Sequence, residues 1–263
     1  MTQPPAIGHE VLFDVSDHVA VLQFNRPEKR NAISAAMAEA LGWAVTQVEQ
    51  DRDIRVAILA SSTAGIFSAG ADLAEIARTG GRSLMTADGG FAGFIDAKRE
   101  KPWIAAVDGP AVGGAFEIAL ACDMILTTPG SYFGLPEVKR GILAGAGGAF
   151  RLPRALPRAI ALELLATGEP LNAKRAEAFG LVNRIVDARQ LLATARALAD
   201  NIAANAPLSV TASLSIARQA YDLSVNDLRS LSNELSSLVS ESEDASEGPR
   251  AFLEKRRPNW KGR

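Results

Sequence analysis

Two glutamates in this sequence lie among apolar residues, where a carboxyl group is suited to acid and base chemistry. Glu117 stands in the run Gly-Ala-Phe-Glu-Ile-Ala-Leu, and Glu137 stands in Tyr-Phe-Gly-Leu-Pro-Glu-Val. Apolar surroundings disfavour the ionised carboxylate, so its pKa rises towards the range useful for proton transfer near neutral pH. The alternative is an ordinary ion pair, for which Lys139 and Arg140 are available to Glu137.

Two glycine-containing turns could supply hydrogen-bond donors to a ligand. They are Phe67-Ser-Ala-Gly-Ala-Asp72 and Asp108-Gly-Pro-Ala-Val-Gly-Gly-Ala-Phe-Glu117, and each follows a β-rich run and precedes a predicted helix. The first amides of a helix have no intrahelical acceptor, and small residues let a ligand approach the backbone. Two such amides aimed at one point would form an oxyanion hole. The alternative is a pair of tight strand-to-helix turns, and neither turn has the spacing of a phosphate-binding loop.

The elements that must position these residues follow an alternating pattern. Predicted strands cover residues 11–13, 19–24, 55–60, 104–107 and 124–127, with a hairpin turn at Asp17-His18. Predicted helices cover residues 34–51 and 115–122, and the first of them carries an apolar stripe. Residues 80–90 are expected to form a mobile polar loop. Strands that alternate with helices through residue 190 predict an α/β core.

The segment after residue 200 is predicted to be helical only. We therefore divide the chain into a core, residues 1–200, and a C-terminal helical oligomerisation segment, residues 201–263. One helix of this segment has an apolar stripe, which should be buried against the core or a neighbouring protomer because a lone exposed helix does not need it. The stripe consists of Val225, Leu228, Leu231, Leu235 and Leu238.

Composition narrows the choice of partners and compartment. A formal net charge of −2 provides no overall field for nucleic acid or an anionic membrane. No apolar run approaches the roughly 20 residues that span a bilayer, and residues 1–10 lack a signal-peptide pattern. The single cysteine, Cys122, excludes an intramolecular disulfide and is expected to be a buried structural thiol. We expect a cytoplasmic protein without a metal site.

In the order and spacing of its motifs, the sequence resembles the crotonase superfamily, that is, the enoyl-CoA hydratase/isomerase family, over nearly its whole length. The resemblance implies an α/β fold: a crotonase-type spiral of repeated strand–strand–helix units, followed by helices that form a trimer, often paired into a hexamer. The matching segments are residues 24–33, 67–73, 101–109, 113–119, 133–137, 145–148, 176–183 and 247–258.

The resemblance also implies roles for individual residues. The backbone amides of Ala71 and Gly114 would bind the oxygen of an acyl-CoA thioester. Glu117 would take a proton from a water molecule that attacks C3, and Glu137 would deliver a proton to C2. Because both carboxylates are present, the resemblance favours an enoyl-CoA hydratase, a hydro-lyase that adds water reversibly across the 2,3 double bond.

Further matches concern the coenzyme A part of the substrate, and no separate cofactor is implied. Ala69, Asp72 and Leu73 would lie beside coenzyme A, and the Gly145 backbone would help to fix the catalytic water. Phe252 and Lys255 would reach the coenzyme A site of a neighbouring subunit.

Several positions depart from the usual family pattern and leave the acyl chain open. The departures are Ala74, Ala115, Phe116, Leu135 and Ala144. Similar features occur in carnitinyl-CoA dehydratases, so a dehydratase of that type is one alternative and a 3,2-enoyl-CoA isomerase is another. A non-catalytic RNA-binding or scaffold member is a third alternative, but RNA binding needs a basic strip with aromatic residues, and this chain is mildly acidic.

Overall fold

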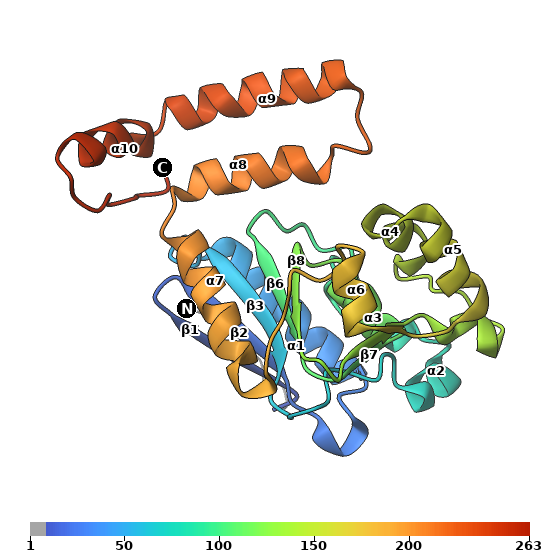
Figure 1. Ribbon diagram of the computed structural model, residues 1–263. Coiled ribbons are helices and arrows are strands. Elements are labelled where there is room, and N and C mark those ends of the chain that lie inside the picture. Colours follow the sequence, from blue (N-terminus) through green and yellow to red (C-terminus); the bar gives the residue numbers. More distant parts are fainter. Residues whose placement is uncertain (1–8) are drawn as a thin grey trace.

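A six-stranded sheet forms the centre of the fold in the order β1-β2-β3-β6-β8-β11 (Figure 1). The computed structural model describes residues 9–263, so the expectation about residues 1–10 falls largely outside the described residues. Only the β1–β2 pair is antiparallel, and all other neighbours are parallel. The strands are β1 (Val11–Ser16), β2 (Val19–Phe24), β3 (Val56–Ser61), β6 (Trp103–Val107), β8 (Met124–Thr127) and β11 (Arg184–Ile185).

Helices cover both faces of this sheet, which explains why β6 and all of β3 except its last residue, Ser61, are apolar. Helix α1 (Ala35–Gln50) packs its predicted stripe on one face, and the Ser34 hydroxyl caps it by accepting from the Met37 amide. Helix α7 (Leu191–Ala203) covers the other face (Figure 1). Alternate residues of β3 therefore enter different cores: Ala57 and Leu59 lie on the α1 side, and Val56 and Ile58 on the α7 side.

A second, smaller sheet carries the turns that the sequence singled out. It contains β7 (Pro110–Val112), β9 (Tyr132–Gly134) and β10 (Leu171–Asn172), with β7 and β9 parallel. The chain thus runs strand–strand–helix from β6 through β7 to α3 (Gly114–Leu120), which confirms the predicted fold class. No sequence pattern marked β7, because Gly109 and Pro110 are turn formers.

Shorter elements complete the core. The sequence predicts a mobile polar loop at residues 80–90, but this segment contains η2 (Arg82–Leu84) and most of a hairpin formed by β4 (Met85–Thr86) and β5 (Gly90–Phe91). In the hairpin, Met85 and Thr86 pair with Phe91 and Gly90. No helix among residues 9–263 is long and apolar enough to cross a bilayer. The remaining bounds are η1 (Pro27–Lys29), α2 (Leu73–Thr79), η2 (Arg82–Leu84), β4 (Met85–Thr86), β5 (Gly90–Phe91), η3 (Pro136–Arg140), α4 (Gly148–Ala155), α5 (Arg158–Thr167), α6 (Ala173–Ala178) and η4 (Ala188–Gln190).

Three C-terminal helices stand away from the sheet (Figure 1). They are α8 (Pro207–Arg218), α9 (Val225–Ser240) and α10 (Glu243–Leu253), and they begin after α7, which spans the predicted division at residues 200/201. The apolar stripe of α9 is not buried against the core: Val225 is 74% and Leu238 53% exposed, and the other three leucines are half-buried. Burial against a neighbouring protomer remains a prediction.

One arginine at the end of α8 ties these helices to the core. The Arg218 guanidinium donates to both carboxylate oxygens of Asp123, each at 2.8 Å, and to the carbonyl oxygens of Arg99 and Lys101 at 2.8 and 2.9 Å. Asp123 also accepts from the Trp103 amide at the start of β6, so the network reaches the central sheet.

We expect Arg218→Gln to lower the free energy of unfolding by about 2 kcal/mol, because hydrogen bonds to charged groups contribute about 1.5–3 kcal/mol. Urea denaturation at pH 7 would measure the loss. Arg229→Gln is the matched control, since Arg229 is exposed on α9. Equal stability of the two variants would contradict an anchoring role for Arg218.

Candidate active site

Glu117 lies in the first turn of α3 with its carboxyl group buried. The residue is 3% exposed, and its Oε1 accepts a hydrogen bond from the Gly148 amide at 2.8 Å. Burial raises the pKa of Glu117 to about 7, with a smaller contribution from the charge of Glu137, whereas the Gly148 amide opposes the rise. A carboxyl group with this pKa exchanges protons readily near neutral pH.

Glu137 lies in η3 and is also buried, at 8% exposure. Burial raises its pKa, and the charge of Arg140 opposes the rise. Its Oε2 has no hydrogen-bond partner within residues 9–263. Lys139 instead binds Glu169 at 2.6 Å. The ion-pair alternative is therefore wrong for Glu137, and no ion pair holds Glu117 in the described part of the chain.

Two glycines, which have no side chain, leave the space that the carboxyl groups of Glu117 and Glu137 occupy. A Cβ on Gly113 would lie 3.1 Å from Glu137 Oε1, and a Cβ on Gly148 would lie 3.1 Å from Glu117 Oε1 and 2.8 Å from Leu135 Cδ1. Both glutamates line one cavity of about 440 Å³. The structure thus brings together the two carboxyl groups that the sequence proposed as acid and base.

The two glycine turns meet at the same cavity. Ser68 and Ala111 form a parallel bridge, and a Cβ on Gly70 would lie 2.4 Å from the Val112 carbonyl oxygen and 3.2 Å from the Gly114 nitrogen. Gly70 has a φ of +86°, so glycine suits both its conformation and the close contact. Within the described residues, the amides of Ala71 and Gly114 donate to no protein acceptor, and both residues line the cavity.

The remaining predicted ligand contacts divide into two groups. Gly145 lines the cavity, whereas Ala69, Asp72 and Leu73 do not. The Asp72 carboxylate caps α2 and pairs with Arg26 at 2.7 Å, which lowers its pKa.

The two C-terminal candidates lie apart from the cavity. Phe252 is 83% exposed on α10, and Lys255 follows α10, far from α2 and α4, which flank the cavity (Figure 1). Neither residue belongs to the wall of the cavity in its own subunit. A contact with the site of a neighbouring subunit stays a prediction.

Several residues of the site escaped the sequence-based prediction. Gly148 belongs to a motif that the sequence did mark, but its amide was not assigned to Glu117. Arg151 holds the loop before α4 by donating to the carbonyl oxygens of Ala146 at 3.1 Å and Ile95 at 3.2 Å. Phe91 lies against the oxyanion-hole turn, because a Cβ on Gly114 would come within 2.5 Å of its ring. No sequence pattern marked Phe91.

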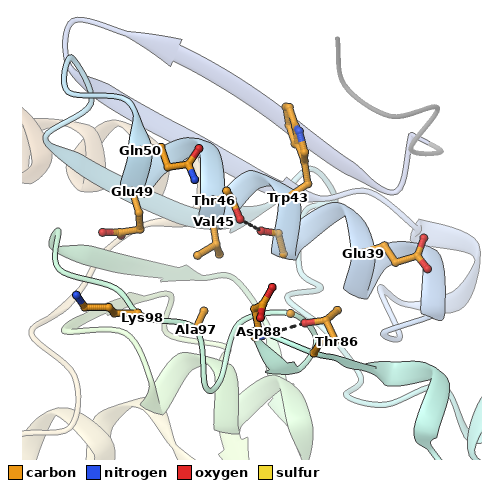
Figure 2. Close-up of a pocket in the computed structure, with 14 residues that line it drawn as sticks. Glu39, Trp43, Val45, Thr46, Glu49, Gln50, Thr86, Asp88, Ala97 and Lys98 are labelled. Atoms are coloured by element: carbon orange, nitrogen blue, oxygen red, sulfur yellow. Dashed lines mark hydrogen bonds between the residues drawn. The ribbon is translucent and has the colours of Figure 1, made fainter. Parts of the chain in front are cut away.

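A second cavity, of about 480 Å³, lies between α1 and residues 86–98 (Figure 2). One of its acidic residues, Glu49, has a structural role: it accepts from the Trp103 indole at 3.0 Å and from the Glu100 and Lys101 amides. No cluster of three metal-ligating side chains occurs between residues 9 and 263. Cys122 is a partly buried thiol whose pKa burial raises to about 12, which disfavours the nucleophilic thiolate near neutral pH.

Comparison with known proteins identifies the family. The family model described as enoyl-CoA hydratase/isomerase matches residues 14–263. A carnitinyl-CoA dehydratase of Proteus mirabilis is 43% identical over 244 residues, covering 91% of this chain and 93% of that protein. The crystal structure of an enoyl-CoA hydratase from Mycobacterium tuberculosis superimposes with a TM-score of 0.92 at 41% identity, over 97% of this chain and 99% of that one.

A carnitinyl-CoA hydratase from Mycobacterium avium is also similar, with a TM-score of 0.76 at 41% identity over 97% of this chain and 99% of that one. The chain belongs to the enoyl-CoA hydratase/isomerase family. Members with the names above are hydro-lyases that act on acyl-CoA thioesters. Two buried carboxyl groups and two free amides around one cavity fit a site for that chemistry.

The raised pKa of Glu117 predicts how stability depends on pH. Below about pH 4.5 the Glu117 carboxyl group is protonated in both the native and the unfolded state. Between about pH 4.5 and pH 7 the unfolded chain has lost this proton, whereas the native state still holds it. The free energy of unfolding should therefore fall between these values by about 3 kcal/mol, and Glu137 acts in the same direction.

We expect Glu117→Gln to remove most of this decrease and to be more stable than the natural protein at pH 8. Urea denaturation at pH 5 and pH 8 would measure both effects. The same pH dependence in the two proteins would show that Glu117 is not protonated in the native state.

Proposed function

We propose that this protein adds water reversibly across the 2,3 double bond of an enoyl-CoA thioester. The observation that carries the proposal is the placement of Glu117 and Glu137 in one cavity with the amides of Ala71 and Gly114. Water addition needs a base, an acid and stabilisation of an enolate-like oxygen. These four residues supply all three.

The different surroundings of the two carboxyl groups support different roles for them. Two adjacent buried carboxyl groups resist simultaneous ionisation, so near neutral pH the pair shares a proton. With a pKa of about 7, Glu117 holds this proton in part of the molecules. In the reactive form, which the Gly148 hydrogen bond favours, Glu117 is ionised and is the base, and the proton is on Glu137. Glu117 takes a proton from water as the oxygen attacks C3, and the protonated Glu137 transfers its proton to C2. The site returns to its starting state when Glu117 releases its proton and Glu137 regains one.

The amides of Ala71 and Gly114 bind the thioester oxygen, on which negative charge develops during the attack. Backbone donors at such positions lower the barrier by about 3 kcal/mol in other enzymes. Coenzyme A extends past the first turn, beside Ala69, Asp72 and Leu73, and the Gly145 backbone helps to fix the water. Coenzyme A belongs to the substrate, and no separate cofactor takes part.

The assembly we propose is a trimer or a hexamer in the cytoplasm, without a nucleic-acid or membrane partner. The support is the exposed apolar stripe of α9 and the exposed Phe252. In the assembly, Phe252 and Lys255 contact the coenzyme A of a neighbouring subunit. Light scattering at micromolar concentration should give the mass of three or six chains, and the mass of one chain would refute this arrangement.

We expect Glu117→Gln and Glu137→Gln each to lower kcat for hydration of but-2-enoyl-CoA by about 10²- to 10⁴-fold, since each removes one proton transfer. The loss of the conjugated thioester absorbance would measure the rate. Binding of a saturated acyl-CoA should change little, because glutamine preserves the shape. Glu163→Gln, at an exposed position on α5, is the matched control.

The same variants distinguish the hydratase from a 3,2-enoyl-CoA isomerase. An isomerase moves a proton between C2 and C4 and can use one carboxylate. Near-normal turnover of a 3-enoyl-CoA by Glu117→Gln would therefore favour the isomerase. Full hydration activity in both variants would refute the mechanism with two carboxylates.

A further inference from the structure

A third cavity, of about 440 Å³, lies where the end of α8 meets α4 and the end of α3. Four guanidinium groups from three separate parts of the chain lie in its wall: those of Arg99 before β6, Arg151 and Arg154 on α4, and Arg218 on α8. In the described part of the chain, the wall contains one carboxylate, that of Asp123. This local excess of positive charge favours an anionic ligand, although the net charge of the whole chain is slightly negative.

Two of the four arginines already have acidic partners. Arg218 donates to both carboxylate oxygens of Asp123, and Arg154 pairs with Asp222, which is not part of the cavity wall. The side chains of Arg154 and Asp222 are 45% and 48% exposed. An ion pair that is this open to solvent is weak, so Arg154 can exchange Asp222 for another anion.

The other two arginines, Arg99 and Arg151, have no carboxylate within 4.0 Å among residues 9–263. Each donates to two backbone carbonyl oxygens: Arg99 to those of Phe94 and Ala121, and Arg151 to those of Ala146 and Ile95. A guanidinium group has five N–H donors, so three on each arginine have no acceptor in the described chain.

The positive charges of this cavity repel one another. Burial lowers the pKa of the Arg99 guanidinium, and the charges of Arg218 and Arg151 add to this effect, whereas the charge of Asp123 opposes it. A charged group that is partly buried without a counter-ion is costly, and a bound anion would offset that cost.

Arg151 separates this cavity from the catalytic one. Its guanidinium lines the third cavity, whereas the residues whose carbonyl groups it binds line the catalytic cavity. Burial lowers the pKa of Arg151. Asp96 and Glu117, which line the catalytic cavity, oppose this effect, and Arg154 in the third cavity adds to it. The uncompensated positive charge therefore lies on the side of the third cavity.

We propose that the third cavity binds the phosphate group of a small anion. The oxygens of a tetrahedral phosphate point in several directions, so they can accept from guanidinium groups that approach from different elements. A planar carboxylate instead suits a two-point contact with one guanidinium. The cavity is larger than a phosphate ion, so a phosphate monoester of a small metabolite also fits. Neither catalytic glutamate lines this cavity, so the proposal does not depend on the hydratase function.

Calorimetric titration with sodium phosphate, at pH 8 and constant ionic strength, tests the proposal. We expect saturable binding with a Kd of about 1 mM or below. Arg154 is the residue to change, because its guanidinium binds no backbone carbonyl in the described chain. Arg154→Gln should raise the Kd by about tenfold, since a charged donor is lost. Arg158→Gln, at an exposed position on α5 outside the cavity wall, is the matched control and should leave the Kd unchanged.

A second variant should shift the Kd in the opposite direction. Asp222→Asn frees Arg154 and removes a competing negative charge, so it should lower the Kd by about threefold. Both variants break the same ion pair, so opposite shifts distinguish phosphate binding from a loss of local structure. Glu169→Gln is the control for this variant, because it breaks an exposed ion pair, with Lys139, outside the cavity wall.

Three results would overturn the proposal. They are the absence of saturable binding, which would follow if a neighbouring subunit filled the cavity, equal Kd values for Arg154→Gln and Asp222→Asn, and competition between phosphate and butanoyl-CoA, which would place the phosphate at the coenzyme A site. A parallel titration with glycerol 3-phosphate identifies the source of the phosphate group. If glycerol 3-phosphate binds at least as tightly as inorganic phosphate, the ligand is a monoester, and if inorganic phosphate alone binds, the ligand is the free ion.

Discussion

The hydrogen bond from the Gly148 amide to the Glu117 carboxyl is the interaction on which the site depends. An ionised carboxyl buried among apolar groups is costly unless donors surround it. Gly148 is the first residue of α4, so its amide has no intrahelical acceptor and is free to donate. The bond joins the starts of α3 and α4, and a side chain at residue 148 would meet both Glu117 and Leu135.

The β7–β9 pair extends this constraint to the other reacting groups. The Gly113 amide donates to the Gly134 carbonyl at 2.8 Å, which fixes the turn before Gly114. The chain then leaves β9 through Leu135 and enters η3, which carries Glu137. One pair of short strands therefore sets the position of an oxyanion-hole amide and of the second carboxyl together. A displacement of β7 would therefore move both the Gly114 amide and the Glu137 carboxyl group, although neither residue belongs to that strand.

The sequence predicted the parts of the fold that depend on local pattern. Strand β8 has the predicted bounds, and the α1 stripe is buried as expected. Strand β7 was missed, because its pairing with β9 overrides the turn propensity of Gly109 and Pro110. The sequence correctly placed the apolar stripe of α9 on a helix. An apolar pattern alone does not identify the surface against which the stripe will be buried. The contact of Gly148 with Glu117 depends on how two helices meet, which no single motif encodes.

The same burial that suits Glu117 and Glu137 to proton transfer works against folding. Both carboxyl groups resist ionisation, so the native state holds protons that the unfolded chain releases. A stabler fold would place apolar side chains at these positions, and the cavity would then lose its acid and base.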